Sequence, residues 1–309
     1  MRVPWKLKAY ALAFLSRAPG GEHAYHALQR LAGTTRLGDR DFSQGGATAL
    51  LDLCRDIGVD PAGKVWLEIG TGWHPILPFL LHLLGAEHVV TVDTHRWMDA
   101  RHAAETVTAI GRVLDQIAEH FGVSGTLLRE RYRTLKHATD LGTLLAAARV
   151  EYRCPVSGSA TGLADASVDV VFSCNVLEHI PPGDLVAVHR EIRRVLRPGG
   201  VAVHRIDPSD HFAHQDPSIT RANFLRFSDS QWSRYGSGLA YHNRLRAAEH
   251  VRLLIEAGFR VLLIRESRNT AIRDAIESGT LPVDARFRAY DPEALAVDYL
   301  QVAGVRLSD

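Results

Sequence analysis

The stretch "LEIGTGWHPILP", residues 67–78, interrupts an apolar run with Gly70-Thr71-Gly72 and then meets two prolines. The run before the glycines, "KVWLEIG" at 64–70, predicts a short buried strand. The segment after them, "PILPFLLHLLGA" at 75–86, predicts a helix that ends at Gly85. In an open α/β sheet, the turn between the first strand and its helix is the default ligand contact. Glycines permit a tight turn there and let the backbone approach a ligand closely.

The same alternation continues outward from this turn. Apolar strand-like runs are predicted at 88–93, 150–156, 166–175, 201–207, 260–267 and 295–307. Amphipathic helices are predicted at 183–200 and 243–259, the second ending near Gly258. Strands that are apolar on both sides and alternate with helices predict an α/β fold with a doubly wound, mostly parallel, Rossmann-like sheet.

Three segments fall outside this alternation. Residues 1–60 are predicted to be a helical N-terminal cap, and within them an apolar stripe follows Ser43-Gln44-Gly45-Gly46 at helical spacing: Ala47, Leu50, Leu51, Cys54 and Ile57. Within the main domain, 61–309, the insertion at about 97–147 has room for two or three helices. The insertion at about 208–242 is rich in histidine, aromatic and acidic residues. We expect all three segments to cover one end of the sheet.

Composition restricts the class of partner. A chain of 309 residues with a net charge of +1 does not present the basic surface that nucleic acid selects, so we expect a small-molecule partner and no nucleic acid. Three scattered cysteines in no Cys-x-x-Cys pair fit a reducing, cytoplasmic location. The apolar stretch Ala9 to Leu15 is too short to span a bilayer, so no integral membrane segment is predicted. Oligomeric state is left open.

The N-terminal segment is predicted to form a short amphipathic helix. It either packs on the body of the protein or touches a membrane surface through Trp5, Lys6 and Lys8.

Pro75 argues against a dinucleotide ligand at the glycine turn. A dinucleotide fingerprint continues Gly-x-Gly-x-x-Gly, but the third glycine is replaced here by Pro75. That glycine normally permits close helix–strand packing, and proline also removes an amide donor. The turn therefore favours a ligand without a diphosphate, and we expect no affinity for NAD.

Four motifs occur in a recognisable order: "LEIGTG" at 67–72, "VVTVD" at 89–93, "DASVDVVFSCNVLEHIPPGD" at 165–184 and "VLRPGGVAVHRID" at 195–207. They resemble the successive motifs of class I S-adenosylmethionine-dependent methyltransferases of the methyltransferase-11 type, typified by the ubiquinone and menaquinone enzymes. The resemblance covers roughly residues 63–206 and continues more weakly at 247–261. It implies a seven-stranded sheet with an antiparallel last strand and a largely helical cap.

The resemblance also implies cofactor contacts for S-adenosyl-L-methionine. Glu68, Gly70, Thr71 and Gly72 would lie along its methionine part, with Glu68 holding the turn or a water near the ammonium group. Asp93, beside Thr94, would accept hydrogen bonds from the ribose hydroxyls. The remaining contacts would come from Ser159, Ala160, Asn175 and Val176.

Adenine recognition departs from the family pattern. The usual acid that bonds the adenine amino group is absent from "SGSATGLADAS" at 157–167. Ser159, a backbone amide or Asp165 from an unusual place would take that role.

The proton acceptor is sought in "HRIDPSDHFAHQDP", residues 204–217, just beyond a predicted strand end. We place His211 first and His214 next among the candidate catalytic residues, because His204 is expected within the sheet. Asn175, at the end of the fourth strand, would face the sulfonium. A metal site is chemically conceivable, but no spacing is diagnostic and none is assigned. The alternative to a catalytic or metal-binding role is that these histidines belong to a polar loop and form hydrogen bonds to its backbone.

Two neighbouring features keep alternative interpretations. His179 is expected to pin the start of the following helix rather than to act in catalysis. Nearby aromatic residues suit either a substrate pocket wall or a small core within the insertion: Phe212, Phe224, Phe227, Trp232, Tyr235 and Tyr241.

The resulting prediction is a methyltransferase that acts by in-line displacement at the sulfonium methyl, with an oxygen, nitrogen or carbon atom of a small molecule as acceptor, in a biosynthetic setting. Two alternatives remain. One is a different displacement at the same sulfonium, either aminocarboxypropyl transfer or intramolecular cyclisation. The other is a non-catalytic protein that binds the cofactor and serves a partner.

Overall fold

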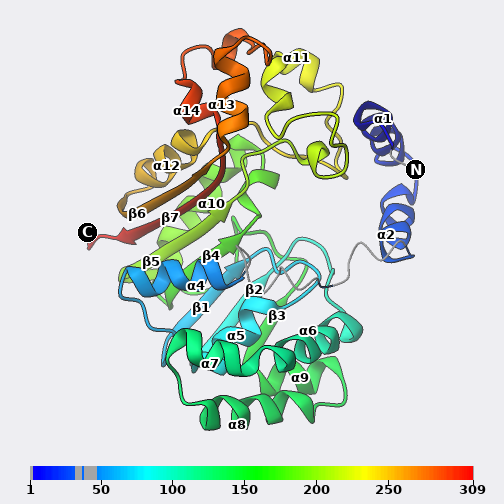
Figure 1. Cartoon of the computed structure of the whole chain (residues 1–309). Coiled ribbons are helices and arrows are strands. Elements are labelled where there is room, and N and C mark those ends of the chain that lie inside the picture. The colour runs from blue at the N-terminus through cyan, green and yellow to red at the C-terminus, as the bar shows by residue number, and fades with distance from the viewer. Residues whose placement is uncertain (1–2, 32–36, 38–46, 309) are drawn as a thin grey trace.

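The computed structural model describes residues 3–31, 37 and 47–308. Its centre is a sheet of seven strands in the order β3-β2-β1-β4-β5-β7-β6 (Figure 1). Only β7 runs antiparallel to its neighbours, pairing with both β5 and β6. The predicted α/β sheet with an antiparallel last strand is confirmed. The strands are β1 Val65–Ile69, β2 His88–Val92, β3 Val150–Arg153, β4 Val168–Cys174, β5 Leu196–Ile206, β6 Phe259–Arg268 and β7 Val297–Arg306.

Both faces of the sheet are buried, as the two-sided apolar strands require. Successive residues alternate between the two faces, so Trp66 and Val89 join one core while Leu67 and Val90 join the other. The first core is covered by α4 (Ala47–Asp56) and α5 (Ile76–Leu84), and the second by α10 (Pro182–Val195) and α12 (Ala247–Glu256). Gly85 ends α5 in the left-handed conformation, as expected.

The insertion after β2 forms four helices rather than the expected two or three. They are α6 Ala100–Arg112, α7 Leu114–Phe121, α8 Gly125–Lys136 and α9 Leu141–Ala147. Their apolar faces join the core around α5, through residues such as Ile110, Ile117 and Leu128. The four helices lie together beside α5 (Figure 1), and their apolar stripes belong to the main core. Trp97, at the start of the insertion, lies at the carboxyl end of the sheet.

The N-terminal segment contributes α1 (Trp5–Leu15) and α2 (Gly21–Leu31) before α4. Trp5 is buried against Phe212, Trp232 and Tyr235, and its backbone N–H donates to the Asp216 carboxylate at 2.8 Å. Of the two interpretations of the first helix, the structure therefore supports packing on the body of the protein. Ser43-Gln44-Gly45-Gly46, the predicted start of the third helix, lies outside the described residues.

A third apolar core lies beyond the sheet, at the end opposite to α6–α9 (Figure 1). It joins Trp5 to the insertion after β5 and to the connection between β6 and β7, which the sequence analysis did not assign. These two segments contain α11 Asp229–Trp232, α13 Thr270–Glu277, α14 Pro292–Leu295 and the 3₁₀ helices His211–His214, Asn223–Arg226 and Ala285–Phe287. Among the described residues, no helix has the length and apolar character needed to cross a membrane.

Candidate functional site

The largest of three cavities in the described part of the chain lies at the carboxyl ends of β1, β2, β3 and β4, where an α/β sheet binds its ligands. We call it the strand-end cavity. Its volume is about 870 Å³, within the range of small-molecule sites. Eight of the residues predicted to contact the cofactor line it: Gly70, Thr71, Gly72, Asp93, Thr94, Ser159, Asn175 and Val176.

The glycine turn forms one wall of this cavity. Gly70 has a φ of +85°, a conformation that glycine adopts at no steric cost. A Cβ atom on Gly70 would lie 2.4 Å from a methyl carbon of Val176, so no larger residue fits without displacing Val176. Gly72 also has a positive φ, but a Cβ atom there would meet nothing within 4 Å. The two glycines therefore serve different purposes, the first permitting close packing and the second only the turn.

Asp93 connects the turns after β1 and β2. One carboxylate oxygen accepts the Gly72 backbone N–H at 2.9 Å, and the other accepts that of His95 at 3.1 Å. Burial raises the pKa of Asp93, and these two backbone donors act against that rise. Each carboxylate oxygen has a second lone pair, so both remain able to accept from a ligand in the cavity. The side chain thus has the position and capacity to bind vicinal hydroxyls.

Glu68 does not line the cavity and lies beneath the turn. Its carboxylate accepts the Thr91 hydroxyl at 2.6 Å, and Thr91 is in turn hydrogen-bonded to Thr71 of the turn. Burial raises the pKa of Glu68 to about 8. In this structure Glu68 acts on the turn through two threonines, which matches the first of its two expected roles.

The segment after β3 supplies Ser157, Gly158 and Ser159 to the cavity wall. Ala160 does not line the cavity, although it was predicted to do so. Asp165 also lies elsewhere, because its carboxylate pairs with Arg194 at 2.5 Å. Of the candidates for adenine recognition, only Ser159 and nearby backbone groups are therefore in place.

Asn175 lines the cavity at the end of β4 with a φ of +56°. Its side-chain oxygen accepts Arg205 Nη1 at 2.6 Å, which fixes the orientation of the amide. Asparagine tolerates this left-handed conformation better than most residues.

Helix α2 closes the outer side of the strand-end cavity, through residues that the sequence analysis did not assign. Glu22 and His26 line the cavity. Glu22 lies 3.1 Å from His95, and the His26 ring contacts Trp97 edge-on at a centroid distance of 4.2 Å. The ring centroids of Trp73 and Trp97 lie 5.0 Å apart.

A second cavity of about 230 Å³, the histidine cavity, adjoins the first and shares His179 and Leu239 with it. Both predicted catalytic histidines, His211 and His214, line this cavity together with His242. They are thus brought near the strand-end cavity without lining it. Lys8 and Tyr25 from α1 and α2 complete the wall.

Asp207 organises the histidines. It lies 3.4 Å from His214 and 3.8 Å from His211, and it accepts Arg221 Nη2 at 3.1 Å. Burial alone would raise the pKa of Asp207, but hydrogen bonds from His214 and Ser209 and the neighbouring positive groups hold it below its usual range. Burial lowers the pKa of His211 to about 4, so its ring is neutral at pH 7.

The other polar residues of the predicted cluster have structural contacts. His204 is fully buried in β5, where Nδ1 lies 2.8 Å from the Ser173 hydroxyl. Asp210 accepts the Phe212 N–H and the Asn223 amide, and Asp216 holds the start of α1. For these residues the polar-loop interpretation describes the structure.

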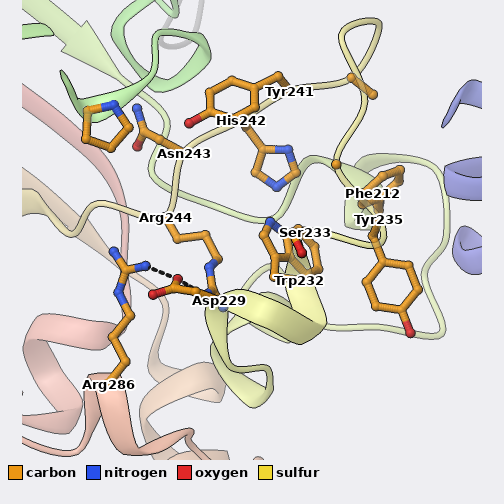
Figure 2. A pocket seen from close by; sticks show the side chains of 13 residues that line it. Phe212, Asp229, Trp232, Ser233, Tyr235, Tyr241, His242, Asn243, Arg244 and Arg286 are labelled. Carbon is orange, nitrogen blue, oxygen red and sulfur yellow. Dashed lines mark hydrogen bonds and ion pairs between the residues drawn. The ribbon is translucent and has the colours of Figure 1, made fainter. Parts of the chain in front are cut away.

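A third cavity of about 290 Å³, the aromatic cavity, is lined by residues of α11 and of the segment that follows it (Figure 2). Its lining includes Trp232 and Tyr235, while Asp229 lies between Arg244 and Arg286 at its edge. Trp232 and Phe212 line this cavity and also belong to the third core.

The segment 236–242 borders all three cavities. Gly238 and Leu239 line the strand-end cavity, while Ala240 and His242 line both of the others. This segment is the shared wall between the place of the predicted cofactor and the place left for a second ligand.

A family model and one relative match parts of this chain. Residues 128–204, from α8 into β5, match the family model described as a methyltransferase domain. Over 48 residues the chain is 56% identical to an "Uncharacterized methyltransferase" of Mycobacterium ulcerans (strain Agy99), a match that covers 15% of this chain and 18% of that protein. The chain therefore matches less than a fifth of the length of that relative.

Solved structures with a similar arrangement of elements include two at low sequence identity. One is an S-adenosylmethionine-dependent methyltransferase from Mesorhizobium loti, with a TM-score of 0.46 and 17% identity, covering 85% of this chain and 99% of that one. The other is "Phospholethanolamine N-methyltransferase 2" from Haemonchus contortus, in complex with phosphomonomethylethanolamine and S-adenosylhomocysteine. Its TM-score is 0.48 at 16% identity, covering 99% of this chain and 61% of that one.

Proposed function

We propose that this chain is a class I, S-adenosylmethionine-dependent methyltransferase and that it methylates a small molecule. The observation that carries the proposal is the strand-end cavity, in which the glycine turn and Asp93 lie together. The ubiquinone-like subtype remains a prediction from the sequence.

The cavity fits the cofactor at two points. Vicinal ribose hydroxyls would be held by Asp93, whose carboxylate is already oriented by two backbone N–H groups. The methionine chain would pass the turn at Gly70, where the absence of a side chain lets backbone and ligand approach. Adenine would lie against residues 157–159, and the sulfonium would face Asn175 and Val176.

The acceptor would enter through the histidine cavity, because His179 and Leu239 border both that cavity and the strand-end cavity. In the transfer, an acceptor lone pair forms the new bond to the methyl carbon. The C–S bond pair returns to sulfur, which leaves S-adenosylhomocysteine. Where the acceptor carries a proton, His214 is the better placed base, because Asp207 lies 3.4 Å away and stabilises the imidazolium that forms. His211, with a pKa lowered to about 4, is the weaker base.

The volumes of the aromatic and histidine cavities favour a small acceptor over a nucleic acid or a protein. The near-neutral charge of the chain supports the same choice. With free cysteines at positions 54, 154 and 174, we propose that the protein works in the reducing cytoplasm.

Calorimetry with S-adenosylhomocysteine tests the cofactor step. We expect binding of one equivalent to the full chain and no heat with NAD, because Pro75 stands at the position of the third glycine. Binding of NAD without binding of S-adenosylhomocysteine would overturn the proposal.

Incubation with labelled S-adenosylmethionine and fractionated metabolite extracts tests the reaction itself. Methyl transfer predicts a labelled product together with S-adenosylhomocysteine. Release of methylthioadenosine would instead indicate attack on the aminobutyrate carbon. Binding of the cofactor with no turnover across acceptor classes would favour a non-catalytic partner.

A further inference from the structure

Three metal-ligating side chains converge where the strand-end and histidine cavities meet. They are Glu178 and His179, from the 3₁₀ helix Leu177–His179 that follows β4, and His211, from the insertion after β5. One ligand atom from each lies within 4.8 Å of the other two. These residues come from segments more than 30 positions apart in sequence, so their meeting is a product of the fold.

Two of the three residues have a buried ligand atom that lacks a hydrogen-bond partner within the described chain. Glu178 is 1% exposed, and its Oε2 accepts no hydrogen bond. Its other oxygen receives only the Asp207 backbone N–H, at 3.3 Å. The Nε2 atom of His211 is likewise buried without a hydrogen bond. Buried polar atoms rarely remain unsatisfied in native proteins, and an ion not represented in a structure is one established cause.

His179 has the orientation of a metal ligand. Its Nδ1 lies 2.8 Å from the Tyr241 carbonyl oxygen. A carbonyl only accepts, so Nδ1 carries the proton and the neutral ring presents a bare lone pair at Nε2. Metal-binding histidines usually donate their second ring N–H to a carbonyl or carboxylate in this way.

On these grounds we infer that Glu178, His179 and His211 bind a divalent transition-metal ion, with Zn²⁺ as the first candidate. Two imidazoles and one carboxylate form a ligand set suited to Zn²⁺ or Fe²⁺ rather than to Mg²⁺ or Ca²⁺. Three protein ligands also leave a coordination position open, as in catalytic rather than structural zinc sites. Ligand atoms around tetrahedral zinc lie about 3.4 Å apart, so the three side chains would draw together on binding.

The open coordination position would face the acceptor, because His179 lines both the strand-end cavity and the histidine cavity and His211 lines the histidine cavity. A bound dication lowers the pKa of a coordinated hydroxyl and fixes its oxygen. This inference rests on the proposed function and narrows it, since the acceptor atom is then an oxygen. His214 is not among the three ligands and stays available to receive the hydroxyl proton.

The test uses Zn²⁺ alone on chelator-treated full-length protein, in competition with a chromophoric chelator. We expect one equivalent to bind, with affinity lowered at least about tenfold in Glu178→Gln and in His211→Ala. Glu178→Gln keeps the size of the side chain and leaves an acceptor for the Asp207 N–H. His137→Ala, which removes an exposed histidine at the end of α8, is the matched control and should bind Zn²⁺ as the wild type does.

Substitution by Co²⁺ gives a second readout that does not depend on activity. Visible absorption typical of a tetrahedral or five-coordinate ion should appear in the wild type and be lost in Glu178→Gln. Equal Zn²⁺ affinity in all variants, or no stoichiometric binding, would overturn the inference. Binding of S-adenosylhomocysteine, measured on the same samples, separates the two proposals. If the protein binds S-adenosylhomocysteine but not Zn²⁺, only the metal site is refuted. If it does not bind S-adenosylhomocysteine, the proposed function is refuted.

Discussion

Replacing Asp93 by Asn tests the cofactor site at the position where the structure is most specific. The variant keeps the size of the side chain, but it loses the charge and replaces one acceptor oxygen with an NH₂ donor. A hydrogen bond to a charged group contributes about 1.5–3 kcal/mol and one to a neutral group about 1 kcal/mol, so losing one charged acceptor and neutralising the other costs about 2.5–4 kcal/mol. At 1.4 kcal/mol for each factor of ten, the Kd for S-adenosylhomocysteine should rise about 10²–10³-fold.

Calorimetry measures this change, and thermal unfolding shows whether the variant is folded. Asp93→Asn also leaves one of the Gly72 and His95 backbone N–H groups facing an amide donor, so a modest loss of stability is expected. The matched control is Asp165→Asn, because Asp165 is an exposed acid that pairs with Arg194 outside the cavity. Its Kd should stay within about twofold of the wild type. A folded Asp93→Asn protein with near wild-type affinity would refute the assignment of Asp93 to the ribose.

Three further substitutions probe the turn, its support and the acceptor side. Gly70→Ala should abolish measurable S-adenosylhomocysteine binding, because the new Cβ atom clashes with Val176. Gly72→Ala has open space around its Cβ atom and should weaken binding much less. Equal losses of affinity in calorimetry would contradict this prediction. Glu68 holds its proton up to a pKa of about 8 in the folded protein, against an ordinary value of 4.5, so the folded state binds more protons between these values and loses stability as pH rises through them. In urea unfolding, the wild type should therefore lose stability relative to Glu68→Gln by up to about 1.4 kcal/mol per pH unit, and parallel pH profiles would refute this. His214→Ala should lower turnover about 10²–10⁴-fold with unchanged S-adenosylhomocysteine affinity, and full turnover would return His214 to the role of a loop residue.

The sheet could be predicted from sequence because its signals are local. The strands β1, β2 and β4 are apolar runs followed by Gly70, Asp93 and Asn175, and the carboxyl ends of parallel strands lie at one edge of the sheet. That rule places Gly70, Asp93 and Asn175 together without any knowledge of the cap. The glycine turn was equally clear from Gly70 and Gly72, whereas the close approach of Val176 to Gly70 became visible only in the structure.

The cap could not be predicted in the same way, because its contacts are non-local. Trp5 packs on Phe212, more than 200 positions away, and Glu22 lies beside His95 across the strand-end cavity. Nothing near these residues in the sequence indicates their partners. The convergence of Glu178 with His211 was missed for the same reason, although both belong to motifs that the sequence analysis quoted.

The segment 236–242 is a wall shared by three cavities, so ligands in different cavities can act on one another through it. Because it borders all three cavities, a ligand that shifts this segment from one side reshapes the space on the other sides. The affinities for cofactor and acceptor then become coupled, and such coupling is reciprocal. For example, a compound in the aromatic cavity that tightens cofactor binding is itself bound more tightly, by the same factor, when the cofactor is present. An inhibitor of this protein therefore need not resemble either substrate, provided that it fixes this segment in one position.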